Sequence, residues 1–502
     1  MSERERLQPS PDVVRRPASH RVIDDVVTLL SPVRASTGRA ALAVMLGLDG
    51  GGGAPPRDTA ARTGVTRQRV DQVRVRITAH WNDARAEIPG IRSAIARVTA
   101  LAPDDASAIE QRLVREGLLP PGFQLQGIEA AAELIGAKPS WSVAIVGAVR
   151  HVVVGSSRAA HHVLPAARRL AELFGLATVD DVAKSAAATS GGAIDNDAVR
   201  SLLGDASVRW LDDEHRWFAF DDIDGGISDR VGAALRLCGA LDAPSLRAGL
   251  TRDPWRWPTA PPSRVLEALC NGLPGFDVHR REIAIHDPPH EPEIAVATVA
   301  FVAELRTRPE WTWDGALRLS GRLKIPRRSL TRALVHSPAI ERLPAGIFRV
   351  RKGGTPNVTA WPLQPKALFA VPEIGPAWVA WRVTATIKRA GQAKLPELRK
   401  DLDPTIALYD PWGGALGVAR IVGKAICGLD EVFARRGGEV GDMLAVVFNR
   451  GPGEATVLLG APELVAWLHD GIAAMDEIAF TSGRLRGDRV KPTGRPHRRS
   501  PT

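Results

Sequence analysis

Residues 57–81 read RDTAARTGVTRQRVDQVRVRITAHW, and this stretch decides how the N-terminal part of the chain folds. A short helix is predicted to end at Gly64, and a second helix to begin after Thr66, whose hydroxyl suits a helix N-cap. Small and branched apolar residues fall where two helices joined by so short a turn pack together: Ala60, Ala61, Val65, Val70 and Val73. The spacing therefore predicts a helix-turn-helix whose second helix keeps one face in solvent.

The exposed side of this second helix carries the residue types that read DNA. In helix-turn-helix proteins the N-terminal half of the second helix enters the major groove, where arginine pairs with guanine and glutamine with adenine. The DNA contacts predicted for this helix are Thr66, Arg67, Gln68, Arg69, Gln72, Arg74 and Arg76.

Over about residues 37–81 the segment resembles region 4 of bacterial sigma-70 factors. The matching positions are Gly64, Val65, Thr66, Arg67, Arg69, Val70 and Gln72. The resemblance implies that the helix binds a promoter −35 element, that Arg67, Gln68, Arg69 and Gln72 read bases, and that Thr66 contacts phosphate. Gln68 stands where the family usually has glutamate, which alters the expected base preference. The resemblance covers about 45 of the 502 residues, and the rest of the sequence gives no convincing match to the sigma segments that grip the polymerase core.

A second pattern, a helix followed by a short hairpin, recurs three times at intervals of 65 to 66 residues. The copies cover residues 194–220, 260–285 and 325–350, and Val199, Val265 and Leu330 take the same place in them. A helix, a strand, a polar turn and a return strand are typical of winged-helix domains. The repeats therefore predict three winged-helix-like units, at residues 176–226, 227–290 and 291–355.

Charge distinguishes the three units. From residue 318 to 352 the third unit has ten Lys or Arg against one Glu, and its predicted DNA contacts are Arg322, Lys324, Arg327, Arg328 and Arg332. The first unit has Asn196, Asp197 and an acidic turn at 212–214, which favour a structural or protein-binding role. The second unit mixes Arg264, Arg280 and Arg281 with Glu267, so its contact with DNA stays open.

These segments predict a mainly α chain with small β wings, built from tandem helix-turn-helix and winged-helix units followed by a C-terminal α/β unit. The helix-turn-helix domain is expected at residues 22–86 and a helical connecting domain at 87–175. The C-terminal unit spans 374–480, with a helix at 378–391 and a hairpin at 441–460. Both ends, residues 1–21 and 481–502, are rich in Pro, Arg and Ser and are expected to be disordered.

Composition points to a polyanionic partner. The chain of 502 residues has a formal charge of +10 and a pI near 10.0, which favours binding to phosphates. Its 3 cysteines form no CxxC pair, which indicates a reducing compartment and no zinc site. No apolar run is long enough to span a membrane. We expect a cytoplasmic, nucleoid-associated protein that binds double-stranded DNA and does not contact a membrane.

The sequence contains near matches to motifs for catalysis, metals and cofactors, but their residues do not have the spacing that those motifs require. Residues 417–425, GVARIVGKA, have five residues between the glycines where a Walker loop has four, and Ala425 follows the lysine. His161 and His162 are adjacent and diverge on a helix, and the acidic run 221–226 lacks the closing glutamate of a calcium loop. The tryptophans are interpreted as core anchors in preference to base-stacking platforms. We therefore predict no enzyme activity, no cofactor and no metal.

Two functions remain. In the first, the chain is a sequence-specific transcriptional regulator that grips one duplex through the sigma-like helix and the third winged helix. In the second, it is a DNA-binding scaffold or interaction subunit of a larger nucleic-acid machine, such as a bacterial defence or repair assembly. A protein partner is then expected at the C-terminal unit or the first winged-helix unit. A nuclease whose carboxylates meet only in three dimensions stays open, as does the oligomeric state.

Overall fold

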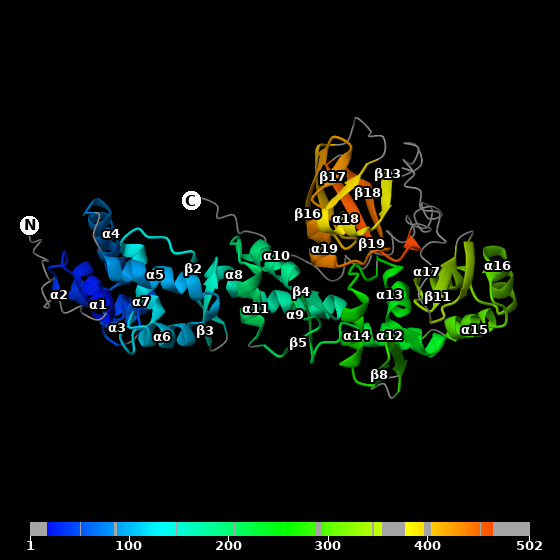
Figure 1. The fold of residues 1–502 in the computed structure, drawn as a ribbon, viewed down its shortest axis with the longest axis horizontal. Helices are drawn as coiled ribbons and strands as arrows, with labels where there is room; N and C mark the ends of the chain where they lie inside the picture. Colours follow the sequence, from blue (N-terminus) through cyan, green and yellow to red (C-terminus); the bar gives the residue numbers. More distant parts are fainter. Residues whose placement is uncertain are drawn as a thin grey trace, which may run out of the picture. The chain divides into compact units, whose positions relative to one another are not determined.

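The computed structural model describes residues 18–50, 52–84, 88–146, 149–204, 206–254, 256–286, 294, 296–343, 346–353, 377–395, 403–451 and 453–464. It is 47% helical and 22% strand (Figure 1). The chain divides into two compact units. Residues 1–169 and 179–208 form the first unit, and residues 170–178 and 209–502 form the second.

The first unit opens with four helices: α1 (Ala18–Leu29), α2 (Ser36–Met45), α3 (Pro56–Thr63) and α4 (Arg67–Ala84). The first four residues of α1, 18–21, belong to the stretch 1–21 that was predicted to be disordered. The rest of that stretch, and all of residues 481–502, lie outside the described residues. Apolar side chains of α1, α2 and α4 share one core with the helices that follow, including Val22, Leu42 and Ile77.

Within the described residues, one order of elements then occurs four times: helix, strand, helix, helix, strand, strand. We call these stretches repeats 1 to 4. Repeat 1 comprises α5 (Pro89–Leu101), β1 (Asp104–Asp105), α6 (Ala106–Arg115), α7 (Leu125–Leu134), β2 (Trp141–Val146) and β3 (Val149–Val154). After α8 (Ser157–Ala160), repeat 2 comprises α9 (Val163–Phe174), β4 (Ala177–Thr178), α10 (Val179–Ser190), α11 (Asn196–Gly204), β5 (Val208–Trp210) and β6 (Trp217–Phe220).

Repeat 3 comprises α12 (Ile227–Cys238), β7 (Leu241–Asp242), α13 (Ala243–Thr251), α14 (Ser263–Asn271), β8 (Phe276–His279) and β9 (Glu282–Ile285). Repeat 4 comprises α15 (Val296–Leu305), β10 (Trp311–Thr312), α16 (Trp313–Arg322), α17 (Arg327–His336), β11 (Ile340–Leu343) and β12 (Ile347–Val350). In all four repeats the third strand lies between the first and the second. The shared sheet order shows that the repetition in the sequence reflects a shared topology.

The short first strand of a repeat passes directly into a helix because its last residue also caps that helix. In repeat 1 the carboxylate of Asp105 accepts the Ala108 N–H at 2.8 Å, and in repeat 3 Asp242 accepts the Ser245 N–H at 2.8 Å. In repeat 4 the hydroxyl of Thr312 accepts the Gly315 N–H at 3.2 Å. A residue that satisfies a free helix N–H fixes where the strand ends.

Residues 87–175, expected to form a helical connecting domain, also contain the hairpin strands β2 and β3 of repeat 1. Its hairpin strands have 6 residues each, whereas those of repeats 2 to 4 have 3 or 4. The longer hairpin breaks the fixed distance between helix and closing strand that reveals the other three copies in the sequence.

The C-terminal region is a nearly closed, barrel-like sheet of seven strands, coloured yellow to red in Figure 1. The strands are β13 (Ala377–Arg382), β14 (Gln392–Lys394), β15 (Thr405–Tyr409), β16 (Ala415–Val422), β17 (Ala425–Cys427), β18 (Met443–Gly451) and β19 (Glu454–Gly460). Their order is β13-β18-β19-β15-β16-β17-β14, and only β15 and β19 pair in parallel. Two helices accompany the sheet, α18 (Ala385–Ala390) and α19 (Asp430–Arg436). The prediction of a mainly α chain with small β wings is therefore wrong.

One local prediction in this region is also wrong. Residues 378–391 were expected to form a single helix, but they form strand β13 and the short helix α18. Trp378, Val379 and Trp381 are all buried, so both faces of the strand are covered and its apolar run shows no alternation. The hydroxyl of Thr384 accepts the Ile387 N–H at 3.2 Å and starts α18. The hairpin predicted at 441–460 is confirmed as β18 and β19.

Candidate nucleic-acid interface

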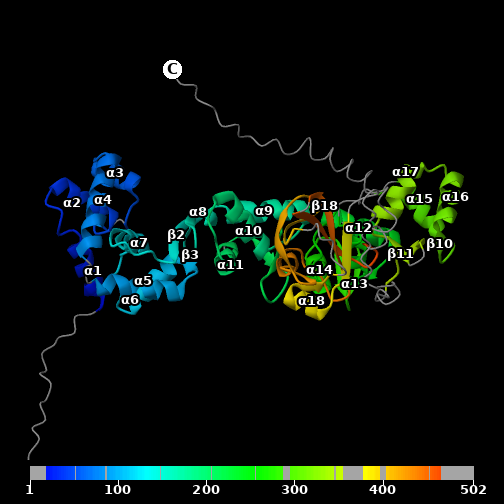
Figure 2. The same cartoon turned by 90° about the horizontal axis from the view of Figure 1, so that it is seen from above.

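Helices α3 and α4 are joined by a tight turn, as the sequence predicts (Figure 2). Gly64 ends α3 with a φ of 69°, a left-handed conformation that glycine adopts without steric cost. The hydroxyl of Thr66 accepts the Arg69 N–H at 3.4 Å, and α4 begins at Arg67. The predicted end of the first helix and the predicted cap of the second are both confirmed.

Helix α4 is held by one apolar stripe. Val70 and Ile77 are buried, and the half-buried Val73 packs against the same core. Of the residues expected between α3 and α4, Ala60 and Val65 are half-buried but Ala61 is exposed. Thr59 is buried in its place, and its hydroxyl donates to the Ala54 carbonyl at 3.0 Å. A fixed inner face determines which residues of α4 point outward.

We define the outward face of α4 as Gln68, Gln72, Val75 and Ala79, which lie opposite the buried stripe by helical geometry. All four residues are exposed, and Val75 is 64% exposed. The amide oxygen of Gln72 accepts from the Arg69 guanidinium at 3.3 Å. The face presents amide groups and aliphatic groups, the two chemistries that recognise adenine and the thymine methyl.

Arginines flank this face. Arg69 and Arg76 are exposed on one side, and on the other Arg67 forms a loose ion pair with Asp71 at 3.8 Å. The sequence prediction missed Val75 and Ala79 because it selected polar residues. Their spacing of seven and eleven residues from Gln68 is a helical signal that identifies the same face.

Arg74 behaves differently from the other predicted contacts on α4. Its guanidinium pairs with Glu133 of α7 and lies 3.7 Å from Asp71. The side chain therefore points toward α7 and forms an ion pair between the two helices. It does not belong to the outward face.

In repeat 4, Lys324 is exposed and has a φ of 52° in the turn between α16 and α17. Lys324 takes the position before α17 that Gly64 takes before α4, because two residues separate each of them from the helix that follows. Arg322 is exposed and pairs with Glu304 at 2.7 Å. The other predicted contacts lie on α17, but their side chains are outside the described part of the structure: Arg327, Arg328 and Arg332.

Helix α14 of repeat 3 corresponds to α17 of repeat 4, and its N-terminus already binds a carboxylate of the protein. Both the N–H and the hydroxyl of Ser263 donate to the Glu439 carboxylate, at 2.6 and 2.9 Å. The next residue, Arg264, pairs with Glu214 at 2.8 Å, and this hydrogen bond lowers the pKa of the glutamate. Protein groups therefore already satisfy the donors that a phosphate would need at this helix end.

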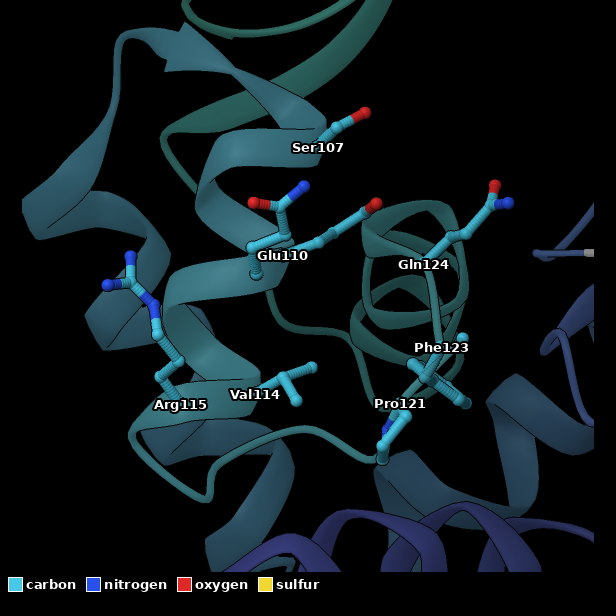
Figure 3. Close-up of a pocket in the computed structure, with 9 residues that line it drawn as sticks. Ser107, Glu110, Val114, Arg115, Pro121, Phe123 and Gln124 are labelled. Atoms are coloured by element: carbon cyan, nitrogen blue, oxygen red, sulfur yellow. The ribbon is translucent and has the colours of Figure 1, made fainter.

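In repeat 1 a carboxylate of the protein likewise binds the N-terminus of helix α7. The Glu110 carboxylate accepts the Leu125 N–H at 2.9 Å and two donors of Arg150 at 2.8 Å. Gln126 accepts a further Arg150 donor at 2.8 Å. These groups adjoin an open pocket between α6 and α7, where Glu110 and Gln124 lie on opposite sides (Figure 3). Three of the polar side chains that line the pocket already bond to Arg150: Ser107, Glu110 and Gln124.

The remaining sequence motifs have structural roles. Residues 417–425 form β16 and its turn into β17, and not a loop that opens a helix. Trp217, Trp257 and Trp311 are buried, and the Trp257 indole donates to the Phe174 carbonyl at 3.0 Å. Trp255 lies outside the described residues. Within the described ranges, no three His, Cys, Asp or Glu side chains cluster closely enough to hold a metal ion.

No family model and no curated protein matches the chain. Among the helices that the structure describes, none is both long enough and apolar enough to cross a membrane.

Proposed function

We propose that this chain is a DNA-binding protein that contacts duplex DNA through the outward face of α4. The observation that carries the proposal is the anchored helix itself, in which buried Val70 and Ile77 hold Gln68, Gln72 and Val75 in solvent. Glutamine amides pair with adenine, and an aliphatic side chain packs on the thymine methyl. The flanking arginines, Arg69 and Arg76, supply charge for phosphate or guanine.

Through this contact the protein regulates transcription at specific DNA sequences. Repeat 4 adds a second, basic contact through Lys324 and the arginines of α17, and a formal charge of +10 favours association with a polyanion. Base-edge contacts from α4 supply the sequence preference, while repeat 4 adds affinity through phosphates.

A scaffold function is the second candidate, and a specific observation favours it. The helix ends that would face DNA in repeats 1 and 3 are closed by the carboxylates of Glu110 and Glu439. Repeats closed in this way act as spacers or docking modules. In this function DNA binding has no sequence preference and depends strongly on salt.

Selection of bound sequences from random duplexes at about 150 mM salt separates the two functions, because salt suppresses binding that is only electrostatic. The proteins are the full chain, the double variant Gln68→Ala/Gln72→Ala, and Arg92→Ala as the control. Arg92 is an exposed residue of α5. We expect a motif rich in A·T pairs from the full chain and from the control, and its loss from the double variant.

If the full chain selects no motif but retains duplex at low salt, the scaffold function replaces the regulator. If the full chain retains no duplex at any salt concentration, both proposals are wrong. If the motif persists in the double variant, the assignment of base reading to α4 is wrong.

A further inference from the structure

The tip of the β8–β9 hairpin in repeat 3 has an unusual turn. Strand β8 ends at His279, β9 begins at Glu282, and these two residues pair across the hairpin. The two residues between them, Arg280 and Arg281, have φ angles of 51° and 70°. A two-residue turn with both φ angles positive is a type I′ turn, which fits the twist of the strands.

Arginine is a poor choice for this conformation. Type I′ turns favour Asn-Gly, because glycine has no Cβ and asparagine tolerates the left-handed region, whereas a long side chain is disfavoured there. The hairpin therefore needs the turn but does not need the arginines. Strained residues that the fold does not require are often found where a protein binds something.

Both arginines are exposed, and no other hairpin tip in the four repeats resembles this one in sequence. The tip of repeat 2 is acidic, with Asp212, Asp213 and Glu214, and the tips of repeats 1 and 4 have the sequences Gly-Ala and Pro-Ala-Gly. The acidic residues of the repeat 3 hairpin, Asp277 and Glu282, belong to its strands and not to the turn. Two guanidinium groups are thus carried at the end of this hairpin.

We propose that Arg280 and Arg281 bind phosphates of duplex DNA, so that repeat 3 engages DNA through its hairpin and not through its closed helix α14. The inference rests on the proposed function, because it assumes that the chain binds DNA. The binding is independent of sequence, since guanidinium groups on phosphates carry no base information.

The turn itself provides a test that does not threaten folding. Arg280→Asn/Arg281→Gly places the preferred type I′ pair in the turn and removes both charges, so its melting temperature should equal or exceed that of the parent. The charge-preserving control is Arg280→Lys/Arg281→Lys. Affinity of the full chain and both variants is measured by fluorescence anisotropy with one random-sequence duplex over a series of salt concentrations.

For Arg280→Asn/Arg281→Gly we expect weaker binding to every duplex and a plot of log affinity against log salt that is flatter by about 0.9 for each lost phosphate contact. The lysine control keeps the parent slope. Equal slopes for the parent and the Asn-Gly variant overturn the inference, and an acidic protein surface then becomes the ligand to test. Failure of the parent chain to bind any duplex overturns the proposed function as well, whereas equal slopes leave the role of α4 intact.

Discussion

At the scale of single residues, Lys324 stands where a glycine is expected. Its φ of 52° lies in the left-handed region, and the Ile325 N–H closes the end of α16 on the Ser320 carbonyl at 2.8 Å. Glycine is the usual residue at such a position because any other side chain costs about 1 kcal/mol there. In the proposed function the charge of Lys324 contacts a DNA phosphate, which a glycine at this position could not do.

Replacing Lys324 separates backbone strain from charge. Lys324→Gly should stabilise repeat 4 by about 1 kcal/mol and weaken DNA binding, because it removes the strain and the charge together. Lys324→Gln removes the charge alone, so it should weaken binding without a gain in stability. Thermal melting and anisotropy at one salt concentration measure both effects. Unchanged affinity in both variants would remove Lys324 from the interface.

At the scale of elements, the contact between α7 and the hairpin of repeat 1 contains a carboxyl group whose ionisation is opposed by burial. Burial raises the pKa of Glu129, while the Val143 N–H donates to its carboxylate at 3.3 Å and partly offsets the shift. Because the folded pKa is raised, this group favours the fold below its unfolded pKa, and that contribution is lost as pH rises through the folded value.

Glu129→Gln therefore tests the sign of this effect. Glutamine can accept the same hydrogen bond without ionising, so the variant should melt at a higher temperature than the parent at neutral pH. The difference should shrink as pH falls to about 4, where an unfolded glutamate takes up its proton. Melting curves of the two proteins at both pH values give the comparison. A gain that is the same at both would assign the effect to packing instead of charge.

The elements that the sequence predicts well are those whose signals are local. Gly64 and Thr66 mark the turn before α4 within a few residues, and the hairpins of repeats 2 to 4 lie at a fixed distance from their helices. Strand β13 was missed because burial on both faces removes the alternation that reveals a strand. The parallel pairing of β15 with β19 joins segments about fifty residues apart, which no local pattern encodes. The inward turn of Arg74 depends in the same way on Glu133, a residue on another helix.

At the scale of the whole molecule, ion pairs removed from solvent join the repeats to the C-terminal sheet within the second unit. Arg247 of α13 donates to Asp442 at 2.6 and 2.8 Å, and both side chains are buried. The same guanidinium donates to the carbonyls of Pro261 and Ala260, at 2.5 and 3.2 Å. Because both charges are buried, removing one partner should cost far more than breaking an exposed pair.

Asp442→Asn removes the carboxylate that hydrogen-bonds to the buried Arg247 and leaves Glu439, 3.6 Å away, as its remaining counter-ion, which should destabilise the second unit by up to about 3 kcal/mol. Hydrogen–deuterium exchange of α13 and β18 follows this loss locally, so unfolding of the first unit does not obscure it. The control is Glu304→Gln, which breaks the exposed pair with Arg322 and should cost less than about 1 kcal/mol. Arg247→Met/Asp442→Leu removes both charges and should regain only part of the loss, because the Pro261 carbonyl loses the Arg247 donor and the Glu439 N–H loses the Asp442 acceptor. Equal costs for Asp442→Asn and Glu304→Gln would mean that the buried pair is not what holds the sheet in place.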